Sequence, residues 1–363
     1  MKFEKQKRPV STCIRHGLAL LLVVVMLTAA AGCSSQELGP TEVSPAEPEN
    51  GSDTPVTDEV TEEELAEPAI FVTASFFPYA DLARQIGGSL VEIHQLVPDG
   101  ADPHSFEPSP RDLIKLESSQ IFIYNGLDME PWLEGALALL ENQEARLLQA
   151  ADMVSLLSYG EKDHDHDDKH DHEHDHDHDH DDDHDHDHGE WDPHIWTDPL
   201  NMVTIGSELL TVFQELDPAN SDIYEENYHL FAAAIEELDE AFRQMAQTAD
   251  QQVLLVSHSA FGYFAHRYGF QEIAVTGITP HAEPNPGRLA ELTNLAREYK
   301  LEYIFFETLA NPRTAEVLAA EAGLKPLMLH NLEGLNQEQR EAGATYLSLM
   351  QENLKTLEKA LVK

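Results

Sequence analysis

The sequence predicts an α/β protein with two Rossmann-like (β/α)4 lobes joined by one long backbone helix. Three observations lead to this fold class. Short runs of β-branched and aromatic residues alternate with helix-like segments, which is typical of parallel βαβ units. The alternation stops at an unusually long helical stretch over residues 218–248 and then begins again. Residues 69–363 number 295, which is enough for one large or two ordinary domains.

Residues 1–32 have the features of an export signal. Five basic residues precede or flank an apolar run over residues 18–28, which is too short to span a bilayer comfortably. The signal ends in Ala30-Ala31-Gly32-Cys33, which resembles a bacterial lipobox with Ala30 where Leu is usual. Processing there would leave Cys33 as the lipidated first residue, whereas the alternative is an ordinary secretory signal with an incidental cysteine. Since Cys33 would be the only cysteine left, the exported chain cannot form an intramolecular disulfide.

Residues 33–68 are predicted to be a disordered acidic tether, because they are rich in Glu, Pro, Ser and Thr and contain hardly any apolar side chains. The whole chain has a formal net charge of −45. Residues 1–32 hold five basic residues and one acidic residue, so their removal subtracts +4 and leaves −49. A protein this negative is not expected to bind nucleic acid, and it suits a cationic cargo.

The N-terminal lobe is predicted over residues 69–217. Its expected strands cover residues 69–74, 90–97 and 120–124, and its expected helices cover 78–86, 110–117, 129–141 and 202–216. The linking helix is predicted over residues 218–250. It carries apolar side chains at spacings of three and four, as one face of a helix requires: Tyr224, Tyr228, Phe231, Ile235, Leu238 and Phe242.

The C-terminal lobe is predicted over residues 251–363. Its expected strands cover residues 253–257, 272–275, 303–306 and 325–329, and its expected helices cover 260–268, 286–299, 312–322 and 337–361. In open α/β sheets, ligands bind at the carboxyl ends of the strands. Candidate functional residues are therefore sought at strand ends and in the loops that follow them.

Residues 161–190 interrupt the N-terminal lobe with little more than alternating His and Asp. This tract holds 11 of the 20 histidines, and its 16 acidic residues against two lysines give a net charge of −14. Imidazoles and carboxylates together can hold several divalent metal ions loosely, and a run without apolar residues cannot fold around them. We expect a weak metal scavenger, with a solvated acidic spacer as the alternative. The histidines are His164, His166, His170, His172, His174, His176, His178, His180, His184, His186 and His188.

Four residues outside the tract stand where metal ligands are expected. His104 and His194 each end an Asp-Pro-His box, His258 follows the strand-like run ending at Ser257, and Glu307 ends the strand-like run YIFFE. Three imidazoles and one carboxylate form a plausible tetrahedral zinc shell that needs no enzyme chemistry. Any one of these histidines alone would be interpreted as a core or capping residue, but two matching boxes, a third His at a strand end and a neighbouring His tract favour a metal site.

Three aspartates near these histidines have two open interpretations. Asp102, Asp192 and Asp198 could accept hydrogen bonds from the ligand imidazoles and so fix their tautomers. Asp-Pro pairs also form turns and cap helices.

Longer motifs extend the pattern over nearly all of residues 70–363: ASFFPYADLARQIGG, LVPDGADPHSFEPSPRDL, YNGLDMEPWL, the charged loop, DPHIWTDPLN, SHSAFGYFAHRYGF, AEPNPGRL and FFETLANPRTAEVLA. In these motifs the chain resembles the metal-binding lipoproteins of bacterial zinc and manganese ABC importers (the cluster A-I, or cluster 9, solute-binding family), and most closely the zinc branch with a His-rich loop. The resemblance implies that His104, His194 and His258 bind Zn²⁺, and that a carboxylate near Glu307 or a water completes the shell.

The resemblance also implies a function and a location. We expect a protein that captures Zn²⁺ in a cleft to which each half contributes two ligands, and passes it to the permease and ATPase subunits of an importer. It would be a monomer, anchored by lipid at Cys33 to the outer face of the bacterial cytoplasmic membrane, or periplasmic in a Gram-negative host. Manganese-type members carry a Glu at the third His and an Asp beyond the Glu307 equivalent, whereas this chain has His258 and Asn311.

Other interpretations remain open at this stage. The same family contains manganese-binding and adhesin-type lipoproteins. A zinc hydrolase would need three ligands and one open water position, with Glu307 as a base, but the His-Glu-x-x-His spacing is absent from the sequence. His281 stands where many members carry an acidic residue, and we interpret it as a loop residue rather than an extra donor. The second-half cysteines of some Gram-negative members are missing, which favours a Gram-positive type of anchor.

Overall fold

The computed structural model describes residues 70–141, 143–159, 191–278, 280, 285–307 and 312–362. The chain divides into two units, Met1–Glu62 and Glu63–Lys363, and every described residue belongs to the second. The predicted export signal, Cys33, the tether, the His tract, His281 and Asn311 lie outside the described residues. Over the described ranges, no helix has the length and apolar character needed to cross a membrane.

The N-terminal lobe contains a parallel sheet with the strand order β2-β1-β3-β4. Its strands are β1 (Ile70–Ala74), β2 (Val91–Gln95), β3 (Ile121–Tyr124) and β4 (Arg146–Gln149). Its helices are α1 (Phe77–Gly87), α2 (Pro110–Glu117) and α3 (Leu133–Leu140). Both α1 and α2 begin with a proline in the first turn, where a missing N–H costs nothing.

The C-terminal lobe repeats this arrangement with the strand order β6-β5-β7-β8, again parallel. Its strands are β5 (Val253–Val256), β6 (Gln271–Ala274), β7 (Tyr303–Phe306) and β8 (Lys325–Met328). Its helices are α6 (Gly262–Tyr268), α7 (Pro286–Glu298) and α8 (Pro312–Ala322). The predicted fold class is therefore confirmed: two α/β lobes, each built on a four-stranded parallel sheet.

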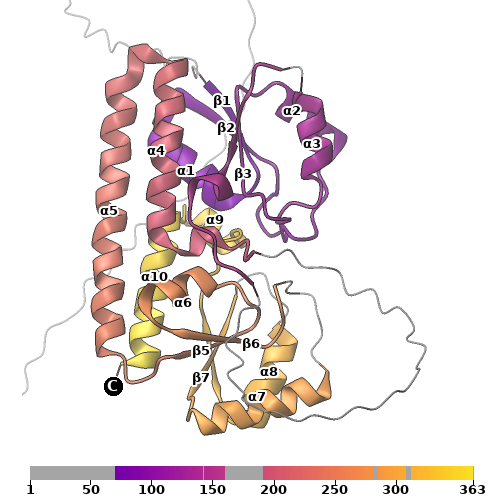
Figure 1. Cartoon of the computed structure of the whole chain (residues 1–363), viewed down its shortest axis with the longest axis vertical. Helices are drawn as coiled ribbons and strands as arrows, with labels where there is room; N and C mark the ends of the chain where they lie inside the picture. The colour runs from indigo at the N-terminus through magenta and orange to yellow at the C-terminus, as the bar shows by residue number, and fades with distance from the viewer. Residues whose placement is uncertain are drawn as a thin grey trace, which may run out of the picture. The chain divides into compact units, whose positions relative to one another are not determined.

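One long helix, α5 (Ser221–Thr248), runs beside α4 (Pro199–Leu216) and α10 (Tyr346–Leu361), as Figure 1 shows. It is bonded to both lobes. Near its start, Asn227 donates through Nδ2 to the backbone oxygen of Ile86 at 3.0 Å. Further along, Asp239 accepts from Arg267 Nε at 2.6 Å. A helix fixed to each lobe in this way restricts the rotation of one lobe against the other.

Two elements differ from the sequence prediction. The strand β4 was not predicted, because its four residues RLLQ carry neither alternation nor β-branching, and pairing with β3 decides their conformation. The predicted closing helix is two helices, α9 (Gln337–Glu341) and α10, separated at Gly343 with φ of 67°. Each has its own capping box, on Asn336 and on Thr345.

The main hydrophobic core is continuous between the lobes. Trp196 lies at its centre, fully buried, with its ring packed edge-on against Phe76 at a centroid distance of 4.9 Å. Its Nε1 donates to the backbone oxygen of Asn331 at 2.7 Å, and its backbone oxygen accepts from Tyr346 Oη at 2.7 Å. Segments of both lobes are therefore held together directly beneath the loops that carry the candidate ligands.

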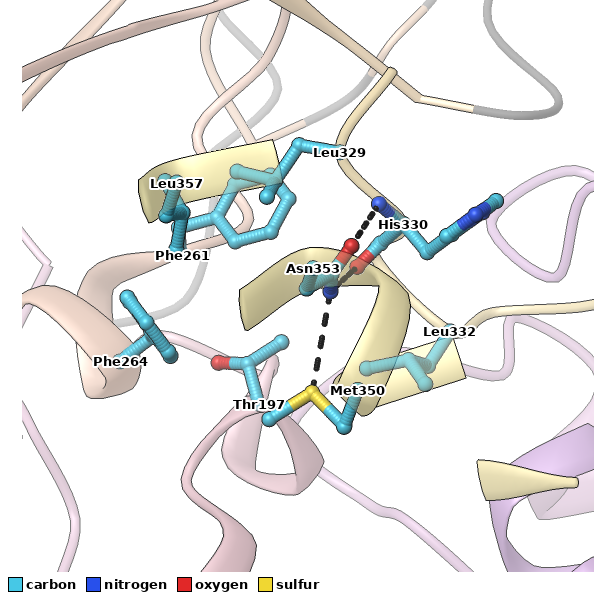
Figure 2. A pocket seen from close by; sticks show the side chains of 9 residues that line it. All are labelled: Thr197, Phe261, Phe264, Leu329, His330, Leu332, Met350, Asn353 and Leu357. Carbon is cyan, nitrogen blue, oxygen red and sulfur yellow. Dashed lines mark hydrogen bonds between the residues drawn. The ribbon is translucent and has the colours of Figure 1, made fainter. Parts of the chain in front are cut away.

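A small, mostly apolar pocket adjoins this region (Figure 2). Asn353 closes one side, because it accepts from the backbone N–H of His330 at 2.7 Å and donates to its carbonyl at 2.8 Å. The lining residues are Thr197, Phe261, Phe264, Leu329, His330, Leu332, Met350, Asn353 and Leu357.

Candidate metal centre

The two Asp-Pro-His boxes fold in the same way. In the loop between β2 and α2, Asp102 Oδ1 accepts from the backbone N–H of His104 at 2.9 Å. Before the short 3₁₀ helix Ile195–Thr197, Asp192 Oδ1 accepts from the backbone N–H of His194, also at 2.9 Å. An aspartate that bonds the backbone two residues on forms a tight turn, and here that turn places the imidazole. The matching sequence therefore has a matching local structure.

The C-terminal lobe contributes two further donors. His258 follows β5, and Glu333 lies in the loop between β8 and α9. Leu332, directly before Glu333, has a φ of 66°, which a leucine seldom adopts. The loop thus holds Leu332, next to Glu333, in a conformation that the surrounding packing must maintain.

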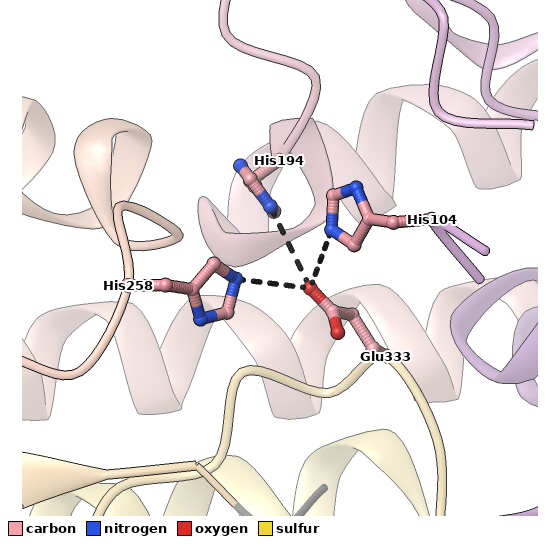
Figure 3. Close-up of side chains that lie close together, drawn as sticks. All are labelled: His104, His194, His258 and Glu333. Carbon is pink, nitrogen blue, oxygen red and sulfur yellow. Dashed lines mark hydrogen bonds and ion pairs between the residues drawn. The ribbon is translucent and has the colours of Figure 1, made fainter. Parts of the chain in front are cut away.

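The four side chains converge on one point between the lobes (Figure 3). Glu333 Oε1 lies 3.3 Å from His104 Nε2, 3.5 Å from His194 Nε2 and 3.4 Å from His258 Nε2. In a tetrahedron the ligand–ligand distance is about 1.63 times the metal–ligand distance, so zinc bonds of about 2.0–2.1 Å require edges of about 3.3–3.4 Å. The three Glu333–histidine edges, at 3.3–3.5 Å, are close to that requirement, and all four donor atoms lie within 4.8 Å of one another.

The site is enclosed. His194, His258 and Glu333 are buried, with 0%, 1% and 2% of their side chains exposed, and the side chain of His104 is 5% exposed. Among the described residues, Nε2 of His194 and both ring nitrogens of His258 have no hydrogen-bond partner of good geometry. Buried polar atoms normally have a partner, so convergent atoms without one indicate a missing ligand.

The charges of the site support each other. Burial would lower the pKa of His194, but its contacts with Asp192 and Glu333 outweigh burial and raise that pKa above its usual value. Burial would also lower the pKa of His258, but the nearby Glu307 and Glu333 carboxylates outweigh burial and raise that pKa well above its usual value. For Glu333, burial would raise the pKa, but the three histidines hold it well below its usual range. The carboxylate therefore stays ionised.

Two carboxylates contact the Nδ1 atoms of His194 and His258, on the side of each ring away from the convergent point. Asp192 Oδ1 lies 2.8 Å from His194 Nδ1. Glu307 Oε2 lies 3.2 Å from His258 Nδ1, and Glu307 also accepts from the backbone N–H of His258 and from the Ser257 hydroxyl. The Asp192 contact with Nδ1 is a hydrogen bond and fixes the His194 tautomer that leaves Nε2 free for a metal, whereas Glu307 lies at ion-pair distance from His258 Nδ1 without hydrogen-bond geometry.

The other two predicted aspartates are placed differently. Asp102 bonds the backbone of its own box and the hydroxyl of Ser105. Asp198 caps the first turn of α4 and forms an ion pair with Arg267 at 3.3 Å. These contacts of Asp102 belong to a turn and those of Asp198 to a helix cap and an ion pair, whereas Asp192 also faces a ring nitrogen of His194.

The structure brings together the three predicted histidines with Glu333, a different carboxylate from the predicted Glu307. Glu307 faces Nδ1 of His258, behind the ring, and is not one of the four convergent donors. Glu333 takes that position. The sequence around it, HNLEGLN, contains none of the signals that mark the other ligands. Its only clue is its place after the last strand of the second sheet, at the same edge as His258.

Comparisons with known proteins support this description. Residues 72–360 match the family described as ZnuA, zinc-uptake complex component A, periplasmic. The high-affinity zinc uptake system protein ZnuA of Bacillus subtilis is 31% identical over 293 residues, which is 81% of this chain and 88% of that protein. The zinc-binding lipoprotein AdcA of Streptococcus pneumoniae is 30% identical over 79% of this chain, and the match spans only 54% of its own length.

A solved structure has the same architecture. The Zn(II)-bound ZnuA-like domain of Streptococcus pneumoniae AdcA is 28% identical and superposes with a TM-score of 0.66, covering 81% of this chain and 99% of that one. The family match spans far more than half of the sequence and includes all four convergent residues. The chain therefore belongs to the ZnuA family of zinc-uptake component A proteins.

Proposed function

We propose that this protein captures Zn²⁺ in the cleft between its lobes and delivers it to an ABC-type importer. The observation that carries the proposal is the group of four convergent donors, two from each lobe, in which the three distances from Glu333 to the histidines are close to the edges of a zinc tetrahedron. His104, His194, His258 and Glu333 would be the ligands. The family to which the chain belongs is that of a transporter component, and the zinc named for its relatives agrees with this donor set.

The donor types favour zinc over manganese. Three imidazoles and one carboxylate suit a borderline ion, whereas manganese prefers carboxylate, carbonyl and water oxygens. The arrangement also favours binding over hydrolysis. A catalytic zinc site keeps one position open for water, and here Glu333 stands in the fourth position.

The location and partners belong to the same proposal. The protein would act outside the cytoplasm, held by a lipid on Cys33, and would meet the permease and ATPase subunits of the importer as a monomer. The tract of residues 161–190 would collect metal ions weakly. The family match and the lipoprotein relative support the export and the importer, while the lipid, the monomeric state and the role of the tract rest on the sequence.

Calorimetric titration with Zn²⁺, combined with elemental analysis, tests the proposal. Replacement of His104, His194 or His258 by Ala should each cost orders of magnitude in affinity, because a site that loses an arm must recruit water. His229→Ala is the matched control, since this histidine is 67% exposed on α5 and should leave the affinity unchanged. Wild-type affinity in the His194→Ala protein would refute the site.

A further inference from the structure

One buried side-chain amide is not among the four convergent donors but is hydrogen-bonded to the backbone next to one of them. Asn125 directly follows β3 in the YNGLDMEPWL segment and is fully buried. Its Nδ2 donates to the backbone oxygen of Gly126 at 2.9 Å and to the backbone oxygen of Pro193 at 3.0 Å. Pro193 is the residue before His194. Asn125 therefore connects the end of the N-terminal sheet to the backbone of a candidate ligand 69 residues further along the chain.

The bonding pattern requires an asparagine. Tyr79 Oη donates to Asn125 Oδ1, and burial raises the pKa of Tyr79 well above its usual value, so the phenol keeps its proton. With Oδ1 bonded to a donor, both N–H groups of Nδ2 must face the two carbonyl oxygens. An aspartate of the same shape would instead place an oxygen against two oxygens.

The segment around Asn125 is itself firmly built. The buried Glu130 accepts from the backbone N–H of Asn125 at 2.7 Å and from that of Gly126 at 3.0 Å. Between them, Leu127 and Asp128 have φ values of 55° and 58°, in the left-handed region that such residues seldom occupy. Strain of this kind persists only where the surrounding contacts fix the backbone.

The peptide group that joins Pro193 to His194 is bonded at both ends. Its carbonyl oxygen accepts from Asn125 Nδ2 and, at 2.8 Å, from the backbone N–H of Ile195. Its N–H donates to Asp192. The plane of this peptide is therefore fixed, and the Ile195 bond also restricts the φ and ψ angles of His194, so together these bonds restrict the direction of the His194 side chain before any metal arrives.

We infer that Asn125 is a positioning residue for zinc binding, which orients His194 through the Pro193 carbonyl, with Tyr79 holding the amide in the required orientation. The inference rests on the proposed function, because it assumes that His194 is a ligand. A group that orients a metal ligand typically changes affinity by about 10–100-fold when it is removed. Preorganisation of His194 would thus contribute to tight binding without Asn125 touching the metal.

The test is the Asn125→Asp variant of the full chain, which keeps the shape of the side chain and removes both N–H donors. We expect Zn²⁺ affinity, measured by competition with a chromophoric chelator, to fall at least tenfold. The visible absorption of the Co²⁺-loaded protein should weaken too, because a displaced His194 disturbs tetrahedral coordination. Loss of folding stability in the metal-free protein, with unchanged affinity and an unchanged Co²⁺ spectrum, would show a structural role only and overturn the inference.

Three companion variants keep the outcome decisive. Gln251→Glu makes the same amide-to-acid change at a side chain that also donates to a backbone carbonyl, that of Tyr299 at 2.9 Å. Gln251 precedes β5, at the end of the strand opposite His258, so this variant should leave affinity and spectrum unchanged. Tyr79→Phe removes only the donor that orients the amide, so it should lower affinity less than Asn125→Asp, and it serves if Asn125→Asp does not fold. If Tyr79→Phe then binds normally, the inference fails. His194→Ala separates the two hypotheses. If His194→Ala binds zinc normally, the proposed site is wrong. If His194→Ala binds zinc weakly and Asn125→Asp binds it normally, only the positioning role is refuted.

Discussion

Two buried carboxylates lie on opposite nitrogens of one imidazole. Glu333 Oε1 is 3.4 Å from His258 Nε2, and Glu307 Oε2 is 3.2 Å from His258 Nδ1. Glu333 faces the nitrogen at the convergent point and Glu307 faces the nitrogen behind the ring, so replacing them should lower Zn²⁺ affinity by different amounts. Glu333→Gln should lower Zn²⁺ affinity by orders of magnitude, because it removes a charged ligand. Glu307→Gln should lower it by about 10–100-fold, because it removes only a charge that orients the His258 ring. Chelator competition on both variants measures the ranking.

The reverse ranking would return Glu307 to the position that the sequence first suggested.

The three histidines could be predicted because two of them repeat the same Asp-Pro-His box and the third ends a strand. Glu333 could not, because its place depends on how the loop after β8 packs against the other lobe. Glu307 does end a strand as expected, but its hydrogen bonds with Ser257 and the backbone of His258 turn the carboxylate toward Nδ1.

The raised pKa values of His194 and His258 set the pH dependence of binding. A metal binds only neutral imidazole, so protons must leave before zinc can enter. Zn²⁺ affinity should therefore decrease as pH falls, and the decrease should begin above pH 6.5, the usual pKa of histidine, because both folded pKa values lie higher. Titration over a pH series, with proton release measured calorimetrically, checks this. An affinity that stays constant from mildly alkaline to mildly acidic pH would contradict it.

The metal-free protein should show the opposite trend on its alkaline side. A raised histidine pKa contributes stability that is fully present below the unfolded value of about 6.5 and is lost as pH rises through the folded value. The lowered pKa of Glu333 contributes stability that is present above about pH 4.5 and is lost as pH falls through its folded value. Thermal unfolding of metal-free protein should therefore show a decline above neutral pH that His258→Ala reduces. A midpoint that rises there would contradict the assignment.

At the scale of elements, the start of α6 lies against the Asp192 side chain. A Cβ at Gly262 would meet Asp192 Oδ2 at 2.3 Å, so only glycine allows this approach. Gly262→Ala should displace Asp192 from His194, weaken zinc binding, and destabilise the metal-free protein by roughly 1–3 kcal/mol, as overpacking does. Denaturant unfolding and zinc competition measure the two effects.

Gly135→Ala is the matched control within a helix. Gly135 lies in α3, where a Cβ would meet no atom within 4 Å. Alanine there should stabilise the protein by about 0.5–1 kcal/mol and leave zinc affinity unchanged. Normal zinc affinity in Gly262→Ala would show that the contact between α6 and Asp192 does not support the site.

Element prediction succeeded where local signals were strong. Prolines mark the starts of α1, α2 and α7, and the three- and four-residue spacing of apolar side chains marks α5, whereas α4 begins at Pro199, three residues before its predicted start. It failed for β4, whose strand conformation comes from pairing with β3 rather than from its own residues. It also missed the break at Gly343, since one glycine in a helical pattern does not by itself show where the chain turns.

At the scale of the whole molecule, the His tract and the cleft should divide the work. The tract offers many donors but no apolar residue to hold them in place, so an ion bound there should cost more chain entropy than one bound at the four convergent donors of the cleft. Deletion of residues 163–188 should leave one tight zinc site and abolish the additional weak ones. Calorimetry with elemental analysis on both proteins tests this, and loss of the tight site on deletion would make the tract the primary binder.

His104 and Glu333 are 229 residues apart in sequence, yet their donor atoms lie 3.3 Å apart. The favourable free energy of folding both lobes offsets the entropic cost of closing so long a loop, so metal binding does not have to offset it. A chain with only its first lobe folded would hold two of the four donors and bind zinc weakly. Zinc at 1,000 times its Kd would then favour the complete native state by about 4 kcal/mol, with little effect on partly folded forms. In kinetic terms, the metal should slow global unfolding while leaving the rate of folding nearly unchanged.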